Sequence, residues 1–117
     1  MTLKWEEVVI DCKDAPALGR WWADALGWDI VDEDEAGLEI RNPDRSSPTL
    51  FFGNVPEPKT VKDRLHLDFV PDDQQVEVDR LISLGATRVD IGQTGEERWV
   101  VLADPEGNEF CILAARH

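Results

Sequence analysis

The sequence predicts an α+β protein in which two copies of one βαβββ module, each with a mixed sheet, form an open, barrel-like cup. Three observations support this prediction. The chain has 117 residues, the size of one domain. The order strand, helix, three strands occurs twice. Landmarks also recur, since Leu26-Gly27 and Leu84-Gly85 lie 58 residues apart (84 minus 26), as do Asp14 and Asp72. Such a module cannot bury its apolar face alone, so the copies should fold together.

The first module is predicted to span residues 5–55. Residues 6–12 are rich in β-branched side chains and predict a strand. Asp14 precedes Ala15-Pro16, which is typical of a helix start, and Gly27 stands where helices commonly end. Three more strands are expected at residues 28–31, 38–41 and 49–55. The acidic run 32–35 falls in the turn between the first two of these.

The second module is predicted to span residues 64–115, after a linker at 56–63 that begins with two prolines, within a single domain of 1–117. It begins with a strand at 64–70. Pro71-Asp72-Asp73 predicts a capped helix start, and the helix should stop at Gly85. Apolar residues mark its buried side: Val76, Val78, Leu81, Ile82 and Leu84. Strands are expected at 87–91, 99–103 and 109–114, with a turn at 104–108.

The charge balance limits the partners. The chain has 25 acidic and 12 basic residues, a net charge of −13. This argues against nucleic acid, whose binding needs a positive face. A solvated acidic surface is the favoured interpretation of the charge, and the charge would also attract a cationic ligand. No apolar run approaches a membrane span, and the N-terminus lacks a signal-peptide pattern, so a cytoplasmic protein is expected. Cys12 and Cys111 do not make a disulfide framework and are expected to be reduced thiols.

Strand alternation separates a helix side from a cup side. On the helix side we expect Val8, Ile10, Cys12, Leu65, Leu67, Phe69, Phe110 and Ile112. On the cup side we expect Trp5, Glu7, Val9, Asp11, Phe51, His66, Asp68, Val70, Glu109, Cys111 and Leu113, with Trp99 at the rim. Burying carboxylates and an imidazole without partners costs several kcal/mol. They must therefore pair with one another, contact water, or bind a ligand or metal.

Four stretches carry a resemblance to a known family. They are the helix end Trp21-Trp22-Ala23-Asp24-Ala25-Leu26-Gly27-Trp28, the strand Leu65-His66-Leu67-Asp68-Phe69, the helix end Leu81-Ile82-Ser83-Leu84-Gly85-Ala86, and the turn Asp104-Pro105-Glu106-Gly107-Asn108-Glu109-Phe110. Together they resemble the vicinal oxygen chelate superfamily of glyoxalase-like and bleomycin-resistance proteins. The resemblance implies the glyoxalase/bleomycin-resistance/dioxygenase fold.

The resemblance also implies where a metal would be held. Metal-dependent members place one ligand on each of the first, fourth, fifth and eighth strands. Carried over, these positions are Glu7, Phe51 or Gly53, His66 and Cys111. Glu7, His66 and Cys111 form a set that zinc accepts, but the usual carboxylate on the fourth strand is missing. The alternative is that His66 bonds Glu7 without any metal. His117 is the only other histidine and is terminal, so a two-histidine iron site is not expected.

Three functions remain open on these residues. The favoured one is a metal-free protein that sequesters an aromatic or cationic small molecule, with no cofactor. Its ligand-binding residues would be Trp5, Glu7, Asp11, Phe51, His66, Asp68, Trp99 and Cys111. The second is a glyoxalase-like lyase or isomerase, using a divalent metal such as zinc, or using His66 with Glu7 or Asp68 for acid–base catalysis. The third is an interaction module with a vestigial cup. A homodimer is expected, because open sheet edges favour pairing.

Overall fold

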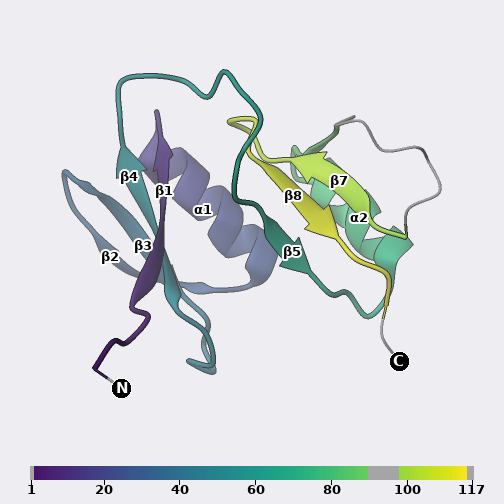
Figure 1. Ribbon diagram of the computed structural model, residues 1–117, viewed down its shortest axis with the longest axis horizontal. Coiled ribbons are helices and arrows are strands. Elements are labelled where there is room, and N and C mark those ends of the chain that lie inside the picture. Colours follow the sequence, from purple (N-terminus) through teal and green to yellow (C-terminus); the bar gives the residue numbers. More distant parts are fainter. Residues whose placement is uncertain (1, 90–97, 116–117) are drawn as a thin grey trace. The chain divides into compact units, whose positions relative to one another are not determined.

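The computed structural model describes residues 2–89 and 98–115, which form two compact units, Met1–Pro58 and Lys59–His117. Each unit contains one four-stranded mixed sheet and one helix (Figure 1). The predicted α+β class with two βαβββ modules is therefore confirmed. Over the described residues the two sheets remain separate and are not closed into a barrel. The predicted strand 87–91 extends in part beyond the described residues, and His117 lies outside them.

The N-terminal unit runs in the predicted order. Its elements are β1 (Glu7–Cys12), α1 (Ala15–Leu26), β2 (Asp29–Glu33), β3 (Gly37–Arg41) and β4 (Thr49–Asn54). The sheet order is β1-β4-β3-β2, with β1 parallel to β4 and the other neighbours antiparallel. The first and last strands of the unit are therefore neighbours, and the chain between them supplies the helix.

Helix α1 begins and ends where the sequence predicts. The Asp14 carboxylate accepts a hydrogen bond from the Ala17 N–H (3.1 Å), and Gly27 ends the helix with a left-handed φ of 69°. The helix packs closely on one sheet face, because a Cβ at Gly19 would lie 2.5 Å from Leu38 Cδ2. The fully buried core is formed there by Leu18, Trp22, Leu38, Ile40 and Phe52.

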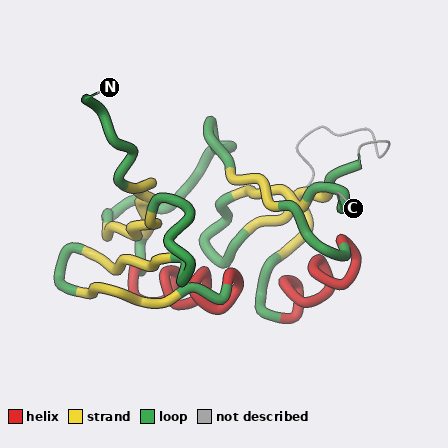
Figure 2. The backbone as a smooth tube through the Cα atoms, turned by 90° about the horizontal axis from the view of Figure 1, so that it is seen from below, coloured by secondary structure: helices red, strands yellow, loops and turns green. Residues whose placement is uncertain are grey.

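The C-terminal unit repeats the topology with shorter strands. Its elements are β5 (Leu67–Phe69), α2 (Gln74–Ser83), β6 (Thr87–Arg88), β7 (Val100–Ala103) and β8 (Glu109–Ile112). The sheet order is β5-β8-β7-β6, again with the first and last strands parallel. In each unit the helix lies along one face of the sheet (Figure 2). We call the opposite face of each sheet the outer face.

The structure defines one predicted cap and corrects two other details. The predicted capped start of α2 is found at Asp73, whose carboxylate accepts from the Val76 N–H (3.2 Å). Asp32 and Glu33 belong to β2 rather than to a turn, and Glu33 is held there by an ion pair with Arg20 (2.7 Å). In α2, Val78 and Leu81 are buried, whereas three further residues expected on that side are exposed: Val76, Ile82 and Leu84.

The start of β5 also differs from the prediction. The strand begins at Leu67 instead of residue 64, and Leu65, expected on the helix side, is 90% exposed. The physical reason is that the Glu109 N–H donates to the Asp63 carboxylate (3.0 Å) instead of to a strand carbonyl. The parallel pairing with β8 therefore starts at Leu67 and Phe110, one residue after Glu109, the first residue of β8.

The helices of the described residues are α1 and α2, and neither combines the length and the apolar character that a membrane crossing requires. Both cysteines are buried, and neither forms a disulfide, as predicted. The Cys12 thiol contacts the Gly53 carbonyl oxygen at 3.6 Å.

Candidate functional site

The outer face of the N-terminal sheet is organised in rows across β1, β4 and β3. The strand registers pair Asp11 with Gly53 and Gly53 with Gly37, which makes one row. They pair Val9 with Phe51 and Phe51 with Glu39, which makes the next. The alternate rows contain Ile10, Phe52 and Leu38 and face α1. Predicted cup-side residues of this unit therefore do share one face.

Phe51 lies over the space that two glycines leave open. A Cβ at Gly37 would be 2.8 Å from Phe51 Cζ, and a Cβ at Gly53 would be 3.4 Å from Phe51 Cε2. The carboxylate of Asp11 borders the same space, since its Oδ1 would be 3.6 Å from the Gly53 Cβ. Phe51 is half-buried and Asp11 is exposed. The arrangement presents an aromatic ring and a carboxylate side by side to solvent.

Further carboxylates surround this pair on the same face. Glu39, next to Phe51 in its row, accepts a hydrogen bond from the Thr49 hydroxyl (2.6 Å). Glu7 pairs in register with Thr49 at the start of the same two strands. Glu7 and Glu39 are both half-buried. The face thus combines one aromatic ring with three acidic side chains, a surface suited to an organic cation.

The outer face of the C-terminal unit carries a different group. His66, Asp68 and Cys111 place one potential ligand atom each within 4.8 Å of the others. His66 Nε2 lies 3.2 Å from Asp68 Oδ1, and Asp68 pairs in register with Cys111. His66 and Asp68 are exposed, while Cys111 is buried. The structure therefore gives His66 the partner Asp68, where the sequence suggested Glu7.

The thiol of Cys111 is held in its protonated form. Burial, together with the charge and hydrogen bond of Asp68, raises the pKa of Cys111 to about 11, and burial is the largest cause. The thiolate is the nucleophilic and metal-binding form of cysteine. At neutral pH Cys111 is thus a weak nucleophile, which agrees with the suppression expected from its acidic surroundings.

These three side chains fit part of a metal site. Imidazole, carboxylate and thiolate are all ligands of zinc, and three protein ligands with a water are the usual catalytic arrangement. A metal would have to displace the Cys111 proton to bind there. Of the predicted ligand set, His66 and Cys111 come together, and Asp68 joins them. Glu7 belongs to the N-terminal unit.

Two backbone hydrogen bonds show which positions of the two units correspond. The Val55 N–H donates to the Cys12 carbonyl, and the Leu113 N–H donates to the Phe69 carbonyl, each at 2.8 Å. Counting back along the paired strands, Asp68 corresponds to Asp11, Cys111 to Gly53, and His66 to Val9. The N-terminal unit therefore has no donor side chain at the positions that correspond to His66 and Cys111.

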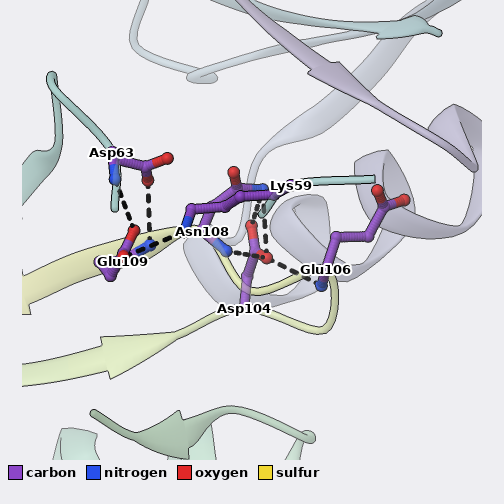
Figure 3. A network of polar contacts seen from close by, with 6 residues as sticks. All are labelled: Lys59, Asp63, Asp104, Glu106, Asn108 and Glu109. Carbon is purple, nitrogen blue, oxygen red and sulfur yellow. Dashed lines mark hydrogen bonds and ion pairs between the residues drawn. The ribbon is translucent and has the colours of Figure 1, made fainter. Parts of the chain in front are cut away.

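A buried polar network in the C-terminal unit escaped the sequence analysis (Figure 3). Lys59 Nζ contacts Glu109 Oε1 at 3.0 Å, and the Asp63 N–H donates to Glu109 Oε2 at 3.2 Å. Burial and, to a smaller extent, the neighbouring Glu109 together raise the pKa of Asp63 to about 6. Burial alone would raise the pKa of Glu109 too, but the hydrogen bonds from Lys59 and backbone N–H groups lower it to about 2.

The network ties part of the predicted linker to β8. Glu109 is buried, and sequence alternation had placed it on the cup side. No pattern at residues 59–63 signals this contact, because Lys59 lies about 50 residues from Glu109 in the chain and belongs to an irregular segment. The neighbouring turn was foreseen, and there Asp104 accepts from the N–H groups of Glu106 (2.9 Å) and Asn108 (3.0 Å) (Figure 3).

The two predicted rim tryptophans line separate hollows. Trp5 is 70% exposed and borders a hollow of about 360 Å³ in the N-terminal unit. Trp99 is 45% exposed and borders one of about 240 Å³ in the C-terminal unit, with Arg98 and Leu113. Trp22 belongs to the core of its unit, and Trp21 stacks edge-on against it at 5.1 Å.

Solved structures share this architecture. A glyoxalase/bleomycin resistance protein/dioxygenase family enzyme from Burkholderia phytofirmans PsJN is similar with a TM-score of 0.74 and 18% identity, covering 97% of this chain and 100% of that one. The fosfomycin resistance protein FosX from Listeria monocytogenes, complexed with Mn(II) and 1S,2S-dihydroxypropylphosphonic acid, has a TM-score of 0.72 and 12% identity, covering 99% and 92%. The bleomycin-binding protein from Streptomyces verticillus, complexed with copper(II)-bleomycin, has a TM-score of 0.64 and 18% identity, covering 99% of each chain.

The fold is thus that of the glyoxalase/bleomycin resistance/dioxygenase superfamily, as the four sequence stretches indicated. The family model described as "Glyoxalase-like domain" matches residues 7–113, and the chain belongs to this family. A comparison with curated proteins found no match. The similar structures bind different molecules, one of them with manganese, so they establish the fold and leave ligand and metal to the residues of this chain.

Proposed function

We propose that the protein binds a small organic cation with an aromatic or flat apolar part, and that it does so without a resident metal. The observation that carries this proposal is the pair of Asp11 and Phe51 beside the space left by Gly37 and Gly53. The ligand would lie on this outer face, with Glu7 and Glu39 as further acidic contacts. His66, Asp68, Cys111, Trp5 and Trp99 stay predicted ligand contacts, and this proposal does not use them.

The chemistry of the face supports a cation. A cation over an aromatic ring gains about 0.5–1 kcal/mol at an exposed site, and more when it is desolvated. A hydrogen bond to a charged group adds about 1.5–3 kcal/mol. The Phe51 ring and the Asp11 carboxylate both lie against Gly53, so they are close enough together to act on one ligand. The net charge of −13 increases the local concentration of any cation.

The metal-free part of the proposal rests on residue identities. Val9 and Gly53 occupy the positions that correspond to His66 and Cys111. The N-terminal unit therefore offers no metal ligand at these two positions. The similar bleomycin-binding protein supports the general idea that this fold can hold a small molecule.

Calorimetric titration with benzyltrimethylammonium tests the proposal. Benzyl alcohol and benzenesulfonate, which present a similar ring with no charge or a negative charge, are the comparison ligands. We expect the cation to bind at least about tenfold more tightly than either. Equal binding of all three, or no heat with any, would contradict the proposal.

Variants locate the binding. Asp11→Asn and Phe51→Leu should each weaken binding of the cation by about tenfold, because each removes one of the two attractive groups. Asp24→Asn is the matched control, since Asp24 is an exposed carboxylate on α1 of the same unit. If Asp24→Asn weakens binding as much as Asp11→Asn, the effect is one of net charge and the site is elsewhere.

The group His66, Asp68 and Cys111 favours a second candidate, a metal-dependent or His66-dependent glyoxalase-like lyase. A bound zinc would polarise a carbonyl oxygen of the substrate. Without metal, His66 would exchange a proton with substrate through Nδ1, while the contact of its Nε2 with Asp68 would orient the ring. Metal analysis of protein purified without chelator decides the metal version. One zinc per chain that is lost in Cys111→Ala supports it, and a content far below one excludes it.

A further inference from the structure

A hollow lies at one end of the N-terminal unit, where β1 and β4 begin and β3 ends. It has a volume of about 360 Å³ and is lined by residues of the N-terminal segment, the end of β3 and the loop that leads to β4. This is the end of the sheet from which the N-terminal segment emerges (Figure 1). It lies beyond the two rows that contain Asp11 and Phe51.

Basic residues gather around this hollow. Residues 1–58 contain five: Lys4, Lys13, Arg20, Arg41 and Arg45. Three of them, Lys4, Arg41 and Arg45, line the hollow. Among its described lining residues Glu6 is the one carboxylate, 3.9 Å from Lys4 in an exposed ion pair. A positive site is thus built into the most acidic part of the chain, which random placement of charges does not explain.

The loop holds Arg45 in a conformation that ordinarily suits glycine. Its φ is 58°, and its N–H donates to the Asn42 carbonyl (2.9 Å). Asp44 accepts from the Ser46 N–H (2.8 Å) and fixes the next peptide. A left-handed arginine is uncommon and carries a steric cost. The cost makes sense if the arginine side chain is needed at this place.

One further lining residue points to a ligand. Trp5 lies at the same hollow with 70% of its surface exposed, which is unusual for so large an apolar ring.

We propose that this hollow binds a small aromatic or flat molecule that carries a carboxylate or phosphate group. The guanidinium groups of Arg41 and Arg45 bind the oxyanion, with geometry suited to two parallel hydrogen bonds. Lys4 adds charge, and Trp5 covers the flat part of the ligand. The inference does not depend on the proposed cation site, because the two use different residues and opposite charges.

Amide and indole chemical shifts of ¹⁵N-labelled protein test the inference. Phenyl phosphate and benzoate are the probes for the two kinds of oxyanion, and inorganic phosphate and benzyl alcohol each carry half of the recognised chemistry. We expect either probe to shift the Trp5 indole N–H and the amides of residues 45–47, with binding that weakens as salt is added. Neither inorganic phosphate nor benzyl alcohol should bind as tightly as phenyl phosphate or benzoate. Absence of these shifts with both probes at millimolar concentration would overturn the inference, as would equal binding of benzyl alcohol.

Variants give the sharper test. Arg41→Gln and Arg45→Gln should each weaken binding about tenfold, and Glu6→Gln should tighten it severalfold by removing the opposing charge. Arg20→Gln removes one positive charge from α1 of the same unit, outside the hollow, and should leave binding unchanged. Spectral dispersion checks folding. If Arg41→Gln does not fold, the exposed Arg45 and Glu6 decide the question, and unchanged affinity in both variants contradicts the site.

Discussion

The two units have the same topology but carry different side chains on their outer faces. Both place the first and last strands of the unit side by side and in parallel, and both cap the helix with an aspartate. Asp11 and Asp68 correspond, yet Asp11 borders Gly53 and Phe51, whereas Asp68 borders Cys111 and His66. The scaffold is thus repeated, while the chemistry on it is divided between a carboxylate–aromatic face and an imidazole–carboxylate–thiol group.

This difference shows that side chains on the helix side of each sheet maintain the common fold. The two units differ in the side chains of their outer faces. Phe52 and Phe110 occupy corresponding helix-side positions and are almost completely buried. One residue further along, Gly53 and Cys111 correspond on the outer face and share neither size nor polarity. Four predictions, two of them at corresponding positions of the two units, test this account.

The largest effect is expected for the matched core positions. Phe52→Ala and Phe110→Ala should each lower the free energy of unfolding by about 3–5 kcal/mol, because each leaves a cavity in a packed core. Urea denaturation followed by circular dichroism measures the loss. A cost below about 1 kcal/mol at either position would show that the two faces are not used alike in the two units.

The two outer-face glycines should differ from each other. Gly37→Ala should cost about 2 kcal/mol or more, because the new Cβ would clash with the Phe52 carbonyl oxygen, which belongs to the backbone and cannot move aside. Gly53→Ala should cost less than about 1 kcal/mol, since its nearest neighbour is the Phe51 side chain at 3.4 Å. The same denaturation measurement applies, and equal costs would refute the described packing of Phe51.

The Asp63 and Glu109 network should make stability depend on pH in the C-terminal unit. The raised pKa of Asp63 contributes stability below pH 4 that is lost as the pH rises to about 6. The lowered pKa of Glu109 contributes stability above about pH 4.5 that is lost as the pH falls to about 2. This pair of carboxyls therefore favours the fold most between about pH 4 and 5.

Asp63→Asn removes the loss of stability that accompanies ionisation of Asp63 as the pH rises to about 6. It keeps a side-chain oxygen that can accept a hydrogen bond from the Glu109 N–H. Relative to the native chain, it should gain up to about 1 kcal/mol in stability at pH 7 compared with pH 4, allowing for solvent screening. Urea denaturation at the two pH values measures the gain. Asp72→Asn, at an exposed carboxylate of the same unit, is the control and should show no such difference.

The smallest effect concerns the matched aspartates. Asp68→Asn should speed alkylation of Cys111 about twofold to fivefold at pH 8.5, because Asp68 raises the thiol pKa while burial, the larger cause, remains. Asp11→Asn should leave that rate unchanged. Mass spectrometry of the alkylated peptide separates Cys111 from Cys12. A decrease in Asp68→Asn would mean that Asp68 activates the thiol instead of suppressing it.

Local signals predicted most of the fold. The Asp14 cap, the left-handed Gly27 and the alternation of β1 and β4 are short-range patterns, and all three are found. The capped start of α2 was predicted at Pro71-Asp72-Asp73, but Asp72 and Asp73 are equally suited to capping by type, and the structure shows that Asp73 is the cap. The buried Glu109 and the late start of β5 depend on Lys59 and Asp63, which are distant in sequence and lie outside regular elements. Such contacts leave no periodic pattern.

The candidate site was predicted by face but not by partner. Alternation placed Asp11, Phe51, His66, Asp68 and Cys111 on the side away from the helices, and the structure agrees. Which of them touch depends on strand register, and register depends on hydrogen bonds that the sequence does not display. The pairing of His66 with Asp68 and the space beside Phe51 therefore required coordinates. The predicted homodimer and cytoplasmic location stay predictions.

A titration of ¹⁵N-labelled protein with benzyltrimethylammonium tests most directly whether the two outer faces have divided their roles. We predict that the amides of Asp11, Phe51 and Gly53 shift first and saturate, and that the corresponding positions His66, Asp68 and Cys111 shift less. Shifts confined to His66, Asp68 and Cys111, or an absence of saturable shifts in both units, would contradict the account.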